Sequence, residues 1–156
     1  MITEDYVSLG VAKLLKEKGF KEWCPKCYGF DARHNGEPID VDEEYELRDA
    51  GRENEIEYVD GGRMYDYGCG NFNPGSPYAA PSLYVAMKWL REVHHLHCNI
   101  GYDNVNWHWD IQTVRKPVTE ETTPKTLPAI TIIGLTYSTY EDACEAAIKE
   151  CLENLI

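Results

Sequence analysis

The chain has 156 residues and a formal net charge of −12, because 27 Asp and Glu residues stand against 15 Lys and Arg residues. This length suits one domain, and a hydrophobic content of 43% is enough to form a core. No apolar run approaches the roughly 18 residues of a membrane-spanning helix, and the first residues lack the pattern of a secretory signal. We therefore expect a cytoplasmic protein without general affinity for nucleic-acid phosphates.

The first predicted helix runs from about Glu4 to Lys18. Its apolar residues fall on one face: Val7, Val11, Leu14 and Leu15. Gly19 followed by Phe20 predicts a Schellman ending, in which the hydrophobic residue folds back on the last helical turn.

A Cys-Pro-Lys-Cys motif follows this helix. Cys24 and Cys27 have the spacing of half a zinc site, since two thiolates three residues apart can reach one tetrahedral ion. Closure would need further ligands from a short set: Cys69, His34, or His95 with His97. No second Cys-x-x-Cys occurs, so we expect two reduced thiols and no cofactor, with zinc as the alternative.

Most of the negative charge lies in one segment. Residues 37–60 have a net charge of −9, whereas residues 1–36 have +1 and residues 61–156 have −4. The segment is interpreted as a solvated loop or edge hairpin, with a contact surface for a basic partner as the alternative. We expect a single domain, 1–156, with an acidic, Tyr-rich hairpin insertion at about 37–76.

The Tyr-rich hairpin is predicted to turn at Gly61-Gly62. The predicted pairs are Tyr58 with Tyr65, Ile56 with Tyr67, and Asp60 with Arg63. Tyr combines a rigid ring with a polar tip, so Tyr58, Tyr65 and Tyr67 suit a protein interface or stacking on a planar ligand. An edge strand rich in Tyr also makes a homo-oligomer plausible.

Two further helices are predicted in the second half of the chain. One opens at Pro81, ends near His94 or His95, and has this apolar stripe: Leu83, Met87, Leu90 and Val93. The other starts with the capping box Ser138-Thr139-Tyr140-Glu141. Its apolar face runs to the C-terminus: Tyr140, Cys144, Ala147, Ile148, Cys151 and Leu155.

Between these helices lie the best strands, His97 to Tyr102, Val105 to Val114 and Ala129 to Leu135. A turn at Asp103-Asn104 predicts a hairpin with one core face and one polar face. The predicted core pairs are Ile100 with Trp107 and Cys98 with Trp109, and the polar pairs are His97 with Asp110 and Asn99 with His108.

These elements predict an α+β fold, with an antiparallel sheet of hairpins packed against three helices. The order helix, three strands, helix is also that of double-stranded-RNA-binding domains. That function is rejected because the last helix starts with Glu141 and Asp142, where a phosphate clamp needs Lys or Arg.

The polar face of the central hairpin is the main candidate ligand site. It would present five side chains: His97, Asn99, His108, Asp110 and Gln112. Such a face is commonly only the solvated side of a sheet. Alternatively, His97, His108 and Asp110 could form an acid–base cluster of a small enzyme.

Several segments resemble short uncharacterised proteins encoded by bacteriophages and mobile elements of gut Bacteroides. The resembling segments are Ile2 to Tyr6, Val11 to Phe20, Ala86 to His94 and Tyr140 to Ile156. The resemblance brings no catalytic residue with it. It implies a small phage-type accessory protein, of the kind that binds a host component or sequesters a small molecule.

We therefore expect a non-enzymatic accessory protein that binds a host protein or a nucleotide-like small molecule. The surfaces expected to do so are the acidic segment, the Tyr hairpin and the polar sheet face. The alternatives are the small enzyme and the zinc-supported structural protein described above.

Overall fold

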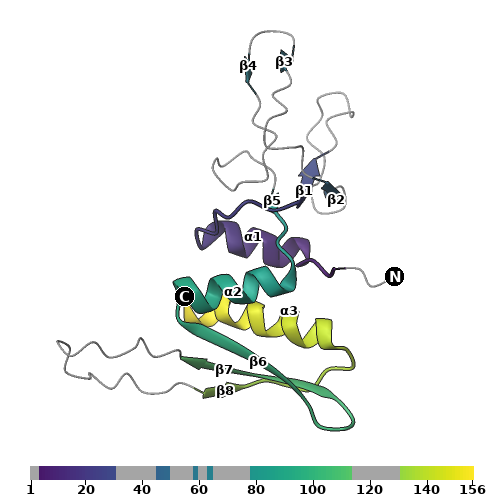
Figure 1. Cartoon of the computed structure of the whole chain (residues 1–156), viewed down its shortest axis with the longest axis vertical. Helices are drawn as coiled ribbons and strands as arrows, with labels where there is room; N and C mark the ends of the chain where they lie inside the picture. Colours follow the sequence, from purple (N-terminus) through teal and green to yellow (C-terminus); the bar gives the residue numbers. More distant parts are fainter. Residues whose placement is uncertain (1–3, 31–44, 50–57, 60–62, 65–77, 114–130) are drawn as a thin grey trace, which may run out of the picture. The chain divides into compact units, whose positions relative to one another are not determined.

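The computed structural model describes residues 4–30, 45–49, 58–59, 63–64, 78–113 and 131–156 (Figure 1). The chain forms two compact units, an N-terminal unit, Met1–Ser82, and a C-terminal unit, Leu83–Ile156. The single domain expected from the sequence stays a prediction. Both units combine helix with antiparallel strands, so the predicted α+β class is confirmed. Among the described residues, no helix has the length and hydropathy needed to cross a bilayer.

The N-terminal unit contains helix α1 (Leu9–Glu17) and two small antiparallel sheets. One sheet has the order β2 (Tyr45–Asp49), β1 (Lys26–Phe30), β5 (Tyr78–Ala79). The other is a hairpin of β3 (Tyr58–Val59) and β4 (Arg63–Met64).

Helix α1 begins later than predicted. Ser8 is its N-cap, and the Ser8 Oγ accepts a hydrogen bond from the Val11 N–H at 3.4 Å. Val7 precedes the helix, and its N–H donates to the Pro81 carbonyl at 3.1 Å. A serine hydroxyl that satisfies an otherwise unpaired helical N–H favours the helix start at this position.

The predicted Schellman ending of this helix is confirmed. The Gly19 N–H donates to the Lys16 carbonyl at 3.1 Å, and the Phe20 N–H donates to the Leu15 carbonyl at 2.9 Å. Gly19 has a φ of 86°, the left-handed region that glycine enters without steric cost. Phe20 is completely buried, so the chain folds back over the last helical turn.

Two glycines of this helix should respond to alanine with opposite signs. Gly19→Ala should destabilise the protein by about 1 kcal/mol, because alanine is strained at a positive φ although no atom lies within 4 Å of the new Cβ. Gly10→Ala should stabilise it by about 0.5–1 kcal/mol, because Gly10 lies within the helix and is exposed. Urea unfolding followed by circular dichroism measures both changes, and equal signs would contradict this account.

The β3–β4 hairpin has a different register from the predicted one. Tyr58 lies opposite Met64 and Val59 lies opposite Arg63, so the predicted pair of Tyr58 with Tyr65 is wrong. Three residues, 60–62, connect the strands instead of the two glycines alone. A shift of one residue reverses which side chains share a face. The other tyrosines of the prediction, Tyr65 and Tyr67, lie outside the described residues.

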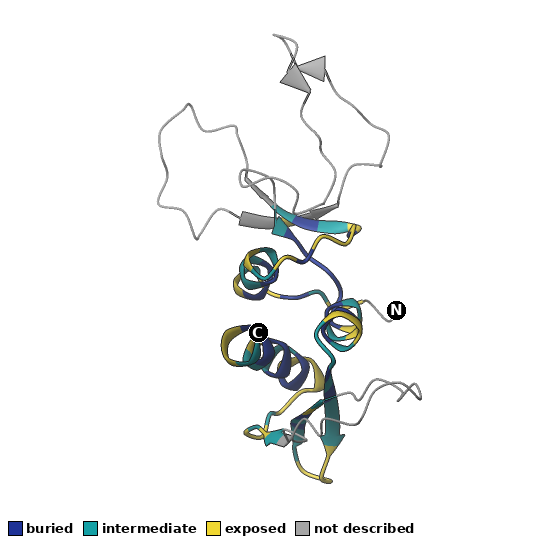
Figure 2. Cartoon of the chain, turned by 90° about the vertical axis from the view of Figure 1, so that its left-hand side faces the viewer, coloured by how far each residue is buried: buried dark blue, intermediate teal, exposed yellow. Residues whose placement is uncertain are grey.

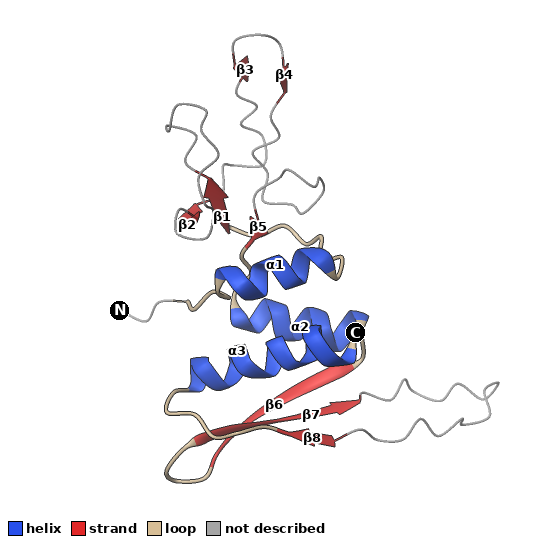
Figure 3. Ribbon diagram, turned by 180° about the vertical axis from the view of Figure 1, so that it is seen from behind, coloured by secondary structure: helices blue, strands red, loops and turns tan. Residues whose placement is uncertain are grey.

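The C-terminal unit has the predicted order of helix, three strands and helix (Figure 3). Helix α2 (Leu83–Val93) leads into an antiparallel sheet, β6 (Leu96–Tyr102), β7 (Trp107–Thr113) and β8 (Thr131–Ile133). Helix α3 (Tyr140–Glu150) continues into a π-helical turn, Cys151–Leu155. Both helices lie on the same face of the sheet, and none of the described residues of this unit forms a helix on the other face.

The β6–β7 hairpin is shifted by two residues from the predicted register. Ile100 lies opposite Trp109 and Cys98 opposite Ile111, so the predicted pairs of these residues are wrong. Asp103 causes the shift: its Oδ1 accepts hydrogen bonds from the N–H groups of Val105 at 3.0 Å and Asn106 at 2.8 Å. These bonds lower the pKa of the Asp103 carboxyl and make a four-residue turn.

A shift of two residues preserves the faces of both strands, because side chains alternate with a period of two. The predicted core face is therefore confirmed for Cys98 and Trp109, which are buried, and Ile111 is buried on the same face. Ile100, also predicted for the core, is only partly buried. Trp107 is only partly buried, and its ring lies beside those of Tyr102 and Tyr140, with centroids 5.0 and 5.2 Å away.

The helices of this unit differ from the prediction in their ends and their buried faces. Helix α2 starts two residues after Pro81, and Val93 is 54% exposed instead of buried. Thr139, not Ser138, is the N-cap of α3, and its Oγ1 accepts from the Asp142 N–H at 3.1 Å. The N-cap of α3 therefore lies one residue later than the capping box predicted.

The core of the C-terminal unit lies between the sheet and these two helices (Figure 2). The buried residues of α2 are Leu83, Ala86, Trp89 and Leu90. Those of α3 and the turn after it are Ala143, Cys144, Ala147, Ile148, Cys151 and Leu152. Alanines at the helix contacts allow close approach, so α3 packs on β6 and β7.

Candidate functional site

The predicted ligand residues of the hairpin do share one face, but the structure brings only three of them together. The Asp110 Oδ1 accepts hydrogen bonds from Asn99 Nδ2 at 2.9 Å and from Gln112 Nε2 at 3.1 Å. Asn99 and Asp110 are directly opposite each other in the ladder. The partners of this carboxylate oxygen are therefore neutral amides.

The two histidines of this face border that cluster, but neither lies opposite Asp110. His97 is opposite Gln112 and His108 is opposite Gly101, so the predicted pairs of His97 with Asp110 and Asn99 with His108 are wrong. Across residues 78–113, neither histidine hydrogen-bonds to the Asp110 carboxylate. The geometry does not assemble the His–Asp pair that the acid–base alternative needs.

The two cysteines considered for zinc are both buried, with exposed fractions of 1% for Cys24 and 7% for Cys27. The Cys24 thiol donates to the Glu22 carbonyl at 3.6 Å, and burial raises its pKa to about 12. Within the described ranges, no three His, Cys, Asp or Glu residues are close enough to hold a metal ion. Cys69 and His34, which closure of the zinc site would use, lie outside those ranges.

A site that the sequence analysis did not identify lies at the β8 edge of the sheet. Ile133 pairs with Asp110, and the next bridge joins Tyr137 to Trp107. Between these bridges, residues 134–136 oppose only residues 108–109, so the outer strand has a β-bulge. Bulges redirect side chains and are frequent beside functional sites.

The bulge depends on a glycine at position 134. A Cβ at Gly134 would overlap the Trp109 indole at Cε2, Cζ2 and Nε1, so only glycine allows the backbone to lie against this ring. The Gly134 N–H also donates to the Trp109 carbonyl at 3.0 Å. The next residue, Leu135, is 80% exposed.

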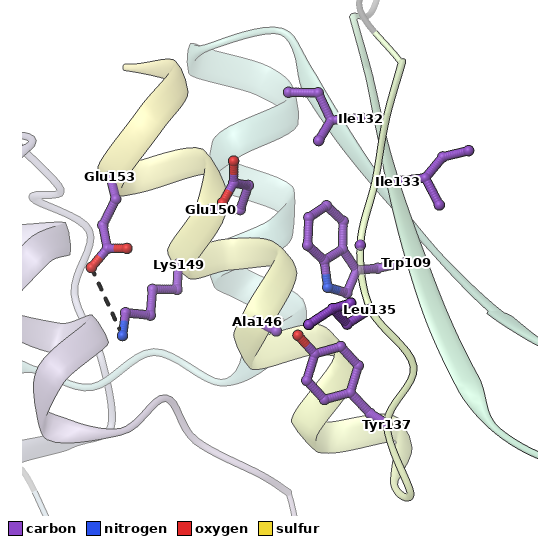
Figure 4. A pocket seen from close by; sticks show the side chains of 10 residues that line it. Trp109, Ile132, Ile133, Leu135, Tyr137, Ala146, Lys149, Glu150 and Glu153 are labelled. Carbon is purple, nitrogen blue, oxygen red and sulfur yellow. Dashed lines mark ion pairs between the residues drawn. The ribbon is translucent and has the colours of Figure 1, made fainter.

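Next to this bulge is a cleft of about 470 Å³, which we call the Trp109 cleft (Figure 4). Its lining comes from β7, from the bulged edge and from one face of α3: Trp109, Ile132, Ile133, Gly134, Leu135, Tyr137, Ala146, Lys149, Glu150 and Glu153. The volume is within the usual range of small-molecule sites, roughly 300–1,000 Å³.

Trp109, which lines the cleft, has an unpaired hydrogen-bond donor. In the described residues, two buried side-chain nitrogen atoms lack a partner, His94 Nε2 and Trp109 Nε1. Trp109 is only 5% exposed. In Figure 4 its indole nitrogen is on the side of the ring that faces Leu135 and the Tyr137 hydroxyl. A buried donor without an acceptor costs about 1–3 kcal/mol, so it is rarely retained in a merely structural position.

The rim of the cleft on α3 is charged and mostly acidic. Lys149 Nζ lies 3.8 Å from Glu153 Oε1, one helical turn away, so this cation is already paired. Glu150 Oε2 accepts a hydrogen bond from the neutral Asn154 side chain at 2.9 Å. The rim therefore has an excess of one negative charge beside an apolar interior.

No protein-family model, curated protein or solved structure matches this chain. The resemblance to phage-encoded proteins therefore stays a prediction.

Proposed function

We propose that the protein binds a small molecule in the Trp109 cleft and performs no chemistry on it. The observation that supports this is the unpaired indole N–H of Trp109, a residue that lines a cleft of about 470 Å³. A ligand that supplies an acceptor would remove the penalty of that buried donor. Apolar lining with a few polar groups is the usual composition of such sites.

Of the two kinds of ligand expected from the sequence, a host protein and a small molecule, this proposal concerns the small molecule. The cleft side chains offer hydrogen bonds and apolar contact, whereas the His–Asp arrangement needed for the enzyme alternative is separated on the opposite face of the sheet. The acidic segment 37–60 and the Tyr hairpin lie largely outside the described residues, so a host protein as partner stays a prediction.

The indole resonances give a direct test of this function. The chain has four tryptophans, and the Trp109 signal in a proton–nitrogen spectrum is assigned as the one that Trp109→Phe removes. When a fragment library is titrated, we expect ligands to move the Trp109 indole signal downfield as its N–H gains an acceptor. If no fragment perturbs this signal, the proposed function is wrong.

A variant at the mouth of the cleft separates binding from stability. Leu135→Ala should weaken the best fragment about fivefold, because apolar contact is lost, and should leave the melting temperature unchanged, because Leu135 is 80% exposed. Val105→Ala is the matched control: Val105 is 76% exposed in the β6–β7 turn and does not line the cleft. Equal weakening by both variants would contradict binding at this site.

A further inference from the structure

The Trp109 indole restricts the chemistry of the ligand. Its Nε1–H is a donor and cannot accept, so a ligand must direct an acceptor toward the base of the cleft. A pure hydrocarbon would leave this N–H unpaired. A ring nitrogen or a carbonyl oxygen would satisfy it, and both are common in heterocyclic compounds.

The apolar lining favours a flat ligand. Trp109 and Tyr137 contribute aromatic rings, and Ile132, Leu135 and Ala146 contribute aliphatic surface (Figure 4). Flat rings pack on aromatic side chains in offset or edge-to-face arrangements. The small side chain of Ala146 limits how far α3 projects into the space.

The charges at the rim determine which ligand charge the cleft favours. Glu150 and Glu153 outnumber Lys149, which already pairs with Glu153. These residues also lie in the C-terminal part of α3 and the turn after it, where the helix dipole is negative. A phosphate monoester, with a charge of about −1.5 to −2 at pH 7, would meet repulsion there.

From these three features we infer that the cleft takes a flat nitrogen heterocycle that is uncharged or cationic and carries no phosphate. This inference rests on the proposed function and narrows it: the ligand is like a nucleobase or nucleoside, not like a nucleotide. The acceptor of the ring pairs with Trp109 Nε1–H, and a donor or positive group on the ligand faces Glu150.

Two pairs of probes test the inference by calorimetry on the full chain. Benzimidazole and indole have the same shape, but only benzimidazole has a ring nitrogen acceptor. We expect benzimidazole to bind at least about fivefold more tightly, with the ratio falling to about one in Trp109→Phe. Adenosine and its 5′-monophosphate differ only in the phosphate, and we expect adenosine to bind about tenfold more tightly at low salt.

The Glu150→Gln variant should reduce the preference for adenosine over its 5′-monophosphate to about threefold. A high salt concentration should do the same, because both changes weaken the repulsion between the phosphate and the acidic rim. Glu141→Gln is the control, since it makes the same charge change on α3 at an exposed position outside the cleft. Equal or tighter binding of the phosphorylated probe, or equal binding of indole and benzimidazole, overturns the inference. So does the failure of all four probes.

The proposed function and the inference fail in different ways. If other fragments move the Trp109 indole signal but these heterocycles do not, the cleft remains a binding site and the ligand class is wrong. If no fragment moves that signal, the proposed function itself is wrong.

Discussion

Replacing Gly134 by alanine should lower the free energy of unfolding of the C-terminal unit by about 3 kcal/mol, the upper part of the usual range for overpacking. The new Cβ would overlap three ring atoms of Trp109, which is 5% exposed. Either the bulge or the indole must shift, so the variant should also lose the affinity of the Trp109 cleft for its ligand. Urea unfolding and the indole spectrum measure the two effects.

Gly101→Ala is the matched control in the same sheet. A Cβ at Gly101 would lie 2.5 Å from His108 Nε2, but that ring is partly exposed and can rotate away. We therefore expect a loss of about 1 kcal/mol or less. Similar losses in the two variants would show that the overlap with the Trp109 ring does not control stability at Gly134.

The second large effect concerns pH, because buried thiols of both units resist ionisation. Burial raises the pKa of Cys24 from 9.0 to about 12. The pKa of Cys151 is raised by its hydrogen bond with Cys98, whose Sγ lies 3.7 Å away, and by burial. Each thiol ionises more easily in the unfolded chain. The stability from each is therefore complete below pH 9 and lost as pH rises toward its folded pKa.

Between pH 9 and 11, the Cys24 thiol should reduce the free energy of unfolding by about 2–3 kcal/mol. Urea unfolding of the wild type and of Cys24→Ala at several pH values measures this contribution. The slope of the unfolding free energy against pH should be smaller in the variant, by an amount that corresponds to at most one proton released on unfolding. Subtracting the curve of the variant from that of the wild type removes the contribution of Tyr and Lys residues. Parallel curves for the two proteins would mean that the thiol ionises normally in the fold.

Local sequence was sufficient wherever adjacent residues decide the conformation. Gly19 and Phe20 predict the helix ending because a left-handed glycine and a hydrophobic residue interact only with the preceding turn. Side-chain alternation likewise predicts the two faces of the central hairpin, since the faces depend on parity and survive the register shift of two.

Register was predicted less well, because it depends on the turn. At Asp103 the side chain binds two backbone N–H groups and lengthens the turn by two residues. His97 therefore lies opposite Gln112 instead of Asp110, and His108 lies opposite Gly101 instead of Asn99. In the β3–β4 pair, Tyr58 lies opposite Met64 instead of the predicted Tyr65. The strands of both hairpins were predicted correctly, but the residue pairs across them were not, so the candidate sites that depend on these pairs are arranged differently.

The Trp109 cleft was missed because its parts are far apart along the chain and each resembles ordinary core. Trp109 was assigned to the core, which is correct for its burial but does not reveal an unpaired N–H. A glycine inside an otherwise β-branched strand, Gly134, was the available signal, since such glycines mark bulges and close backbone approach.

By itself, the sequence determined the α+β class, the order of elements in the C-terminal unit and the polarity of the hairpin faces, because these follow from local periodicity and end signals. Only the tertiary structure decided which residues form a cleft. That outcome depends on the β8 bulge, on Gly134 packing against Trp109 and on α3 lying beside the sheet edge. These are contacts between distant segments, and no local pattern specifies them.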